Sequence, residues 1–84
     1  MKLYLISQSR NDGYDTYDSA VVCAPDEETA RNMNPGGGGQ VDWSPESVNC
    51  STWCYKPEQV KVEYLGETEY SKTPTIVSSS FNAG

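Results

Sequence analysis

Apolar and polar residues alternate imperfectly at the start of the chain, in residues 2–8, KLYLISQ. In an extended segment Leu3 and Leu5 fall on one face and Tyr4 and Ile6 on the other. A strand with apolar residues on both faces is typical of the middle of a sheet, where most of each face is covered. The pattern therefore predicts the first and central strand here.

A second strand is expected after a turn. The dipeptide Asp12-Gly13 lies in a polar segment, and its glycine readily adopts the positive φ that lets the chain reverse. The apolar run 20–23, AVVC, then predicts a strand from about Tyr17 to Ala24. Its small side chains would let a helix approach the sheet closely.

A short helix is predicted directly after this strand. Pro25 has no N–H to give to a sheet and should end the strand, and Asp26 stands where a helix N-cap belongs. The helix is expected from about Glu27 to Asn34, with Ala30 and Met33 spaced to lie on one face against the sheet.

The least regular part of the chain is residues 35–56, which contain four consecutive glycines, Gly36 to Gly39. A phosphate-binding loop needs a strand before its glycines and a helix start after them, and neither is predicted, so the glycines indicate a flexible hinge. Trp43, Trp53 and Tyr55 would either close the small core or form an exposed contact patch. Core closure is the favoured interpretation because the chain has few other large apolar residues.

The last third predicts two more strands. Val60, Val62 and Tyr64 alternate with charged residues, which is the pattern of a strand with one solvent-exposed face. Gly66 should end this strand. Residues 75–81, TIVSSSF, read as a closing strand. The whole pattern predicts one α+β domain over residues 1–84, of order β-β-α-β-β, with a mainly antiparallel sheet and a short helix packed on one face.

Charge limits the partners that this chain can bind. It has 84 residues, with 12 acidic and 6 basic side chains and no histidine, for a net charge of −6. Such a charge opposes binding to nucleic acid or to an anionic membrane and favours a protein with a basic surface. No apolar run is long enough to span a bilayer, and MKLYLIS has too short an apolar stretch for a secretory signal, so we expect a cytoplasmic protein.

The densest group of chemically interesting residues surrounds the predicted turn. Paired carboxylates can act as general acid and base, but this loop has no apolar shelter to separate their pKa values. The aspartate spacing also fails the calcium-loop pattern. The remaining interpretations are turn stabilisation by side-chain hydrogen bonds and a partner-binding surface. The residues of this group are Asp12, Tyr14, Asp15, Tyr17 and Asp18.

Other side chains do not form a recognisable active site. Cys23, Cys50 and Cys54 are odd in number, which favours reduced thiols, and zinc would lack ligands because there is no histidine. Ser78 to Ser80 cannot form a serine–histidine–acid triad for the same reason. We therefore predict no catalytic residue, no metal and no cofactor, and a protein that is not an enzyme.

Several strings in the chain resemble a family of small, largely uncharacterised proteins encoded by phages and prophages. They are MKLYLISQ, YDTYDSAVV, EETAR, VKVEYLGE and the terminal SFNAG, and the similarity covers roughly residues 1–35 and 57–84. The resemblance implies a virus-encoded accessory protein made in the bacterial cytoplasm, and it carries over no catalytic residues.

Three functions remain open at this stage. The leading one is a binding protein that blocks a host system, in particular antiviral defence, by contact with a basic host protein. The second is a homo-oligomeric protein that sequesters a nucleotide signal. The third is a minor virion component. The nucleotide would be held by basic and aromatic side chains, with candidates Arg10, Arg31, Trp43, Trp53, Lys61 and Phe81.

Overall fold

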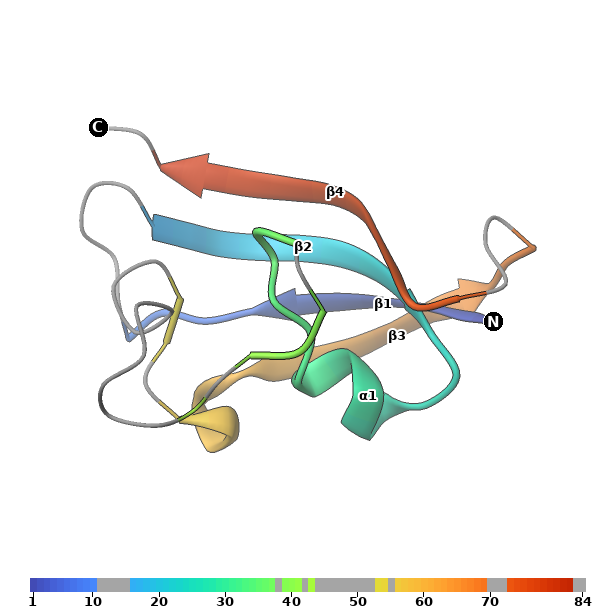
Figure 1. Ribbon diagram of the computed structural model, residues 1–84, viewed down its shortest axis with the longest axis horizontal. Helices are drawn as coiled ribbons and strands as arrows, with labels where there is room; N and C mark the ends of the chain where they lie inside the picture. The colour runs from blue at the N-terminus through green and yellow to red at the C-terminus, as the bar shows by residue number, and fades with distance from the viewer. Residues whose placement is uncertain are drawn as a thin grey trace.

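Four antiparallel strands form one sheet, and a short helix lies across one of its faces (Figure 1). The computed structural model describes residues 1–10, 16–37, 39–41, 43, 53–54, 56–69 and 73–82. Of residues 81 and 82 it describes only the backbone. Its elements are β1 (Lys2–Ser7), β2 (Thr16–Ala24), α1 (Glu27–Arg31), the 3-10 turn η2 (Pro57–Gln59), β3 (Lys61–Glu67) and β4 (Thr75–Asn82). The predicted α+β class is confirmed.

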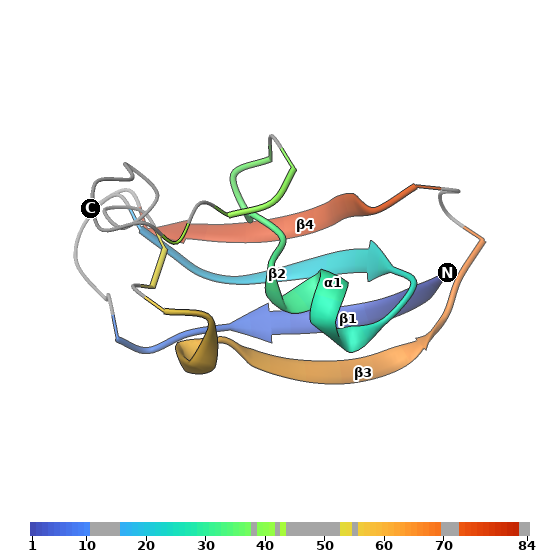
Figure 2. The ribbon, with the colours of Figure 1, turned by 60° about the horizontal axis from the view of Figure 1, so that its bottom comes forward.

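The strand order is β3-β1-β2-β4, with every neighbouring pair antiparallel. The first strand is therefore central, as its pattern of apolar residues on both faces predicts. β3 and β4 follow one another in the chain but lie at opposite edges of the sheet, which Figure 2 shows from the helix side. The chain thus passes from one edge to the other between Glu67 and Thr75.

The core lies between the sheet and α1. Tyr4 and Ile6 of β1 share a face with Ala20 and Val22 of β2, and all four are buried. Ala30 of α1, with no exposed surface, packs against this face. Trp53 is also fully buried in the same cluster, which confirms core closure for this ring. Trp43 packs half-buried at the margin of the cluster, and Tyr55 lies outside the described residues.

The helix begins where the sequence predicts and ends earlier. The Asp26 carboxylate accepts a hydrogen bond from the Thr29 N–H at 2.8 Å, so the predicted N-cap is confirmed. The predicted end at Asn34 is wrong, because α1 stops at Arg31. Beyond it, the Asn32 carbonyl accepts the Val41 N–H at 2.7 Å, and this pairing with a later segment turns the chain away from the helical path.

β3 differs from its predicted form at two positions. Gly66 was expected to end the strand, but the strand continues to Glu67, and Gly66 adopts a φ of 152° beside a bulge that leaves Leu65 as the extra residue. Tyr64 was expected to face the core. It is 55% exposed and covers the core from outside, with its ring packed edge-on against Tyr4 at a centroid distance of 5.8 Å.

None of the helices in the described part of the chain is both long and apolar enough to cross a bilayer.

Candidate functional site

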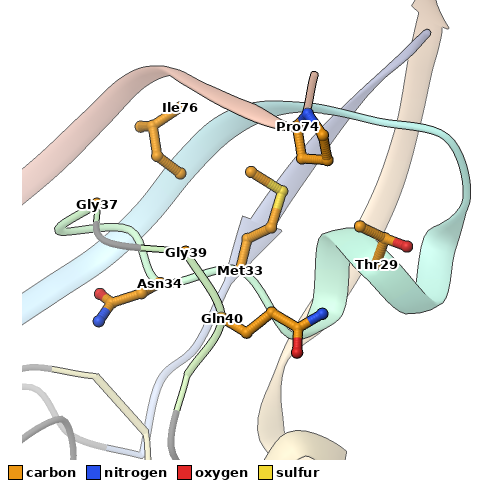
Figure 3. A pocket seen from close by; sticks show the side chains of 8 residues that line it. All are labelled: Thr29, Met33, Asn34, Gly37, Gly39, Gln40, Pro74 and Ile76. Atoms are coloured by element: carbon orange, nitrogen blue, oxygen red, sulfur yellow. The ribbon is translucent and has the colours of Figure 1, made fainter.

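A cavity of about 510 Å³ opens on the helix side of the sheet, beside the start of β4 (Figure 3). Its walls come from three parts of the fold: α1 with Met33 and Asn34 beyond it, the glycine segment with Gln40, and Ile76 of β4 with Pro74 before the strand. The lining residues are Thr29, Met33, Asn34, Gly37, Gly39, Gln40, Pro74 and Ile76.

The glycine segment forms a closed hairpin wall. Met33 pairs with Gln40 in an isolated bridge, and the Asn34 N–H donates to the Gly39 carbonyl at 3.0 Å. The Gly37 N–H returns to the Asn34 carbonyl at 2.9 Å. These hydrogen bonds join both sides of the loop, so the described glycines belong to a hydrogen-bonded hairpin, and their interpretation as a flexible hinge stays a prediction. Gly38 is outside the described residues.

Glycine is favoured in this hairpin for two separate reasons. Gly37 and Gly39 have φ values of 90° and 93°, in the left-handed region that side chains disfavour. Gly36 is limited by space, because a Cβ atom there would lie 3.3 Å from the ring of Tyr17 and from Asn34 Oδ1. The hairpin therefore sits close against β2, and the run of glycines permits this approach.

The cavity lining is apolar with a few uncharged polar groups. Met33 supplies apolar surface in the middle of the lining and Ile76 supplies it on the β4 side, while Asn34 and Gln40 place amide groups at the margin. Such a surface suits an aliphatic side chain with hydrogen-bonding atoms around it, the usual composition of a small recognition pocket.

A carboxylate lies next to this lining. Asp26 contacts Thr29, and hydrogen bonds from the Thr29 side chain and backbone lower the pKa of the Asp26 carboxyl, with a smaller lowering by the charge of Lys2. Asp26 is therefore ionised at neutral pH, and the cavity has negative charge beside its helix wall.

The Tyr and Asp group is only partly described. Asp12, Tyr14 and Asp15 lie outside the described residues. Tyr17 is half-buried and packs against the core, whereas Asp18 is exposed. The register shows that Asp18 is the extra residue of a bulge, between the pairs that Tyr17 and Ser19 make with β4. Partner binding by this group stays a prediction.

The residues suggested for a nucleotide are not brought together around the cavity, and none of them lines it. Trp53 has no exposed surface on which a base could stack. The Trp43 indole N–H donates to Asn32 Oδ1 at 2.9 Å, and Arg31 pairs with Glu27 at 4.0 Å. Arg10 and Lys61 are exposed, and only the backbone of Phe81 is described.

Lys61 and Arg31 also belong to opposite sides of the sheet. Lys61 pairs with Ser7, whereas the neighbouring pair of Val62 and Ile6 faces the core under α1. A phosphate bound by both side chains of one subunit is not supported by this placement.

The cysteines of the described part, Cys23 and Cys54, are buried and form no disulfide among the described residues. Cys23 lies within β2, and Cys54 places its Sγ 3.5 Å from the Lys56 carbonyl. Cys50 is outside the described residues. Among the described residues, no group of three or more His, Cys, Asp or Glu side chains could hold a metal ion.

The sequence did not indicate the cavity. Its lining contains ordinary side chains from residues 29–40 and 74–76, which are far apart in the chain, and the one available signal was the glycine run after the predicted helix. That run indicated a loop without indicating what the loop encloses.

Comparison with protein-family models, with curated proteins and with solved structures finds no match to this chain. Function must therefore be argued from the charge and geometry of the chain itself.

Proposed function

We propose that this protein is a virus-encoded, non-enzymatic binding protein that inhibits a basic host protein, and that its target belongs to an antiviral defence system in the bacterial cytoplasm. The phage-like strings of the sequence support the viral origin. The charge distribution on the surface supports the mode of action, which is contact with a partner of opposite charge.

The observation that carries the proposal is the excess of exposed carboxylates. In the described residues, the exposed bases are Arg10, Lys56 and Lys61. The exposed acids are more numerous and come from five parts of the fold: Asp18, Asp26, Glu27, Glu28, Glu58, Glu63, Glu67 and Glu69. A surface of this sign attracts basic proteins and increases the rate at which they meet it.

Within this surface we place the main contact at the turn end of β2. Asp18 is exposed there, and the bulge turns this residue out of the regular pairing with β4. Asp15 belongs to the same short stretch of sequence. Carboxylates near a half-buried aromatic such as Tyr17 are common in protein interfaces.

The test measures binding after carboxylates are neutralised. Replacing Asp15 and Asp18 together by Asn should weaken capture of a bacterial protein from lysate at low salt, and high salt should release it. The matched control is Glu63→Gln with Glu67→Gln, which removes the same charge from the edge strand β3. We expect the control to retain binding and both double variants to keep stability within about 0.5 kcal/mol of the parent.

Two results would contradict the proposal. One is the absence of any partner that high salt releases, and the other is equal loss of binding in both double variants, which would show that only total charge matters. The inhibitory role is tested separately by infection. A host whose defence blocks a virus should become permissive when it expresses the parent protein and stay resistant with the Asp15 and Asp18 variant.

A further inference from the structure

We infer that β4 and the neighbouring cavity form a docking site for an extended peptide segment of a partner, with an aliphatic side chain in the cavity and basic residues on either side of it. This inference rests on the proposed function and identifies a second contact within it. The segment would add to the sheet as a fifth strand beside β4.

The two edges of the sheet differ in their protection against strand addition. β3 has the charged residues Lys61, Glu63 and Glu67 together with the glycine bulge. These are the features by which natural proteins prevent pairing at an edge. β4, TIVSSSFN, contains neither a charged residue nor a proline, and no described strand lies on its outer side.

The side chains of β4 would also admit a guest strand. Ser78, Ser79 and Ser80 are exposed and small, so they do not obstruct a neighbouring backbone. One irregularity occurs before them, where Val77 is the extra residue between the pairs of Ile76 and Ser78 with β2. Pairing is therefore expected over the serines, and the guest would continue past the bulge toward Ile76.

The cavity begins where this path leads. Ile76 is the β4 residue in its lining, and Pro74 lies directly before the strand (Figure 3). The hairpin that contains Gly37 and Gly39 forms the opposite wall on the helix side of the sheet. A guest strand at the β4 edge can thus place one side chain between the hairpin and Ile76, and Met33 provides an apolar floor.

Charge identifies the occupant as basic. The lining and β4 are uncharged, and an exposed carboxylate, Asp26 beside Thr29, lies at the cavity end of the path. At the other end the exposed carboxylate is Asp18 in the β2 bulge, which is separated from the outer edge by β4. A lysine or arginine beside the aliphatic residue would meet Asp26, and a second one would extend across β4 toward Asp18. A second copy of the chain fits less well, because it would bring another net charge of −6 to the same edge.

The experiment selects peptides from a random short-peptide library displayed on phage, with the full protein immobilised. Enriched sequences should combine an aliphatic residue with lysine or arginine, and synthetic peptides made from them should shift the amide resonances of residues 76–80 in NMR spectra. Cross-strand contacts between peptide and β4 backbones should appear in the same spectra.

The decisive variant is Gln40→Arg, which adds positive charge to the exposed margin of the cavity. It should weaken peptide binding about tenfold or more, because like charges oppose a basic guest. The matched control, Leu65→Arg, adds the same charge at an exposed position of β3 and should change affinity by less than about twofold. Equal melting temperatures for the parent and both variants would confirm that folding is unchanged.

Three outcomes would overturn the inference: no enrichment of basic aliphatic peptides, binding that leaves the β4 amides unshifted, or a dimer in which β4 pairs with its own copy. Failure of the proposed function is a different result. If the Asp15 and Asp18 variant loses the lysate partner while Gln40→Arg keeps it and binds selected peptides normally, the function stands and this site is wrong.

Discussion

Asp26 joins two features of the molecule at the scale of a single residue. Its carboxylate accepts the Thr29 N–H at 2.8 Å and so satisfies a donor that the short helix cannot pair internally. Because Thr29 also lines the cavity, the same side chain fixes the helix start and the charge beside the pocket. An exposed cap with a lowered pKa makes its contribution measurable by pH.

We predict that Asp26→Ala lowers the melting temperature at neutral pH, while Asp26→Ser retains most of the parent stability because its hydroxyl can accept the same hydrogen bond. The folded-state pKa of Asp26 lies below the unfolded value of 3.8, so its ionised form stabilises the fold above that pH. This contribution should disappear as the pH falls through the folded-state pKa.

Thermal melts of the parent and the two variants from neutral to acidic pH provide the measurement. The difference between parent and Asp26→Ala should be largest at neutral pH and should shrink in acid. A difference that stays constant with pH would show that the carboxylate charge does not act through the cap.

At the scale of elements, the bulge in β3 shows how one glycine lets an edge strand continue to its last residue. Gly66 pairs with Leu3, whereas Tyr64 pairs with the next residue of β1, so the strand accommodates one extra position. The φ of 152° at Gly66 makes this possible, since other residues rarely adopt it. The alternation that puts Tyr64 onto Tyr4 depends on this irregularity.

Replacing Gly66 by Ala should therefore destabilise the protein by about 1–3 kcal/mol through backbone strain, although no atom would obstruct the added methyl group. Leu65→Ala is the control, because Leu65 lies in the same bulge and is 48% exposed. We expect its effect to be smaller than that of Gly66→Ala. Urea unfolding followed by circular dichroism measures both values, and equal losses would contradict the assignment to glycine geometry.

At the scale of the whole molecule, a single hydrophobic core contains residues from segments far apart in the chain. Tyr4 from the first strand, Ala30 from the helix and Trp53 from the later irregular segment belong to the same buried cluster. A domain of this size with a single core unfolds in one cooperative step as a rule. Trp53 is therefore part of the unit that unfolds with the sheet.

The variant Trp43→Phe isolates this behaviour, since the chain contains two tryptophans and the remaining one is Trp53. Fluorescence of Trp53 and circular dichroism of the backbone should give the same urea midpoint. The emission should shift from the buried to the exposed wavelength in a single transition. A fluorescence midpoint at a lower urea concentration than the circular dichroism midpoint would show that the segment containing Trp53 separates from the sheet before the sheet unfolds.

Local patterns predicted most of the elements correctly. Alternating apolar residues predicted β1 and β3, short apolar runs predicted β2 and β4, Pro25 marked the end of β2, and Asp26 was identified as the helix cap. These features depend on neighbours in the chain, through backbone hydrogen bonds and side-chain spacing of a few residues. The central position of β1 in the sheet could also be inferred locally, because its own residues are apolar on both faces.

Contacts between distant segments produced the remaining features. α1 ends at Arg31 because Asn32 pairs with Val41, and β3 continues past Gly66 because β1 accepts a bulge there. The cavity likewise arises only when the glycine hairpin, α1 and the start of β4 meet. Such pairings depend on free energies summed over segments far apart in the chain. The residues of one segment predict its own conformation, but its partner and its place at a sheet edge follow from how all the segments bury their apolar faces together.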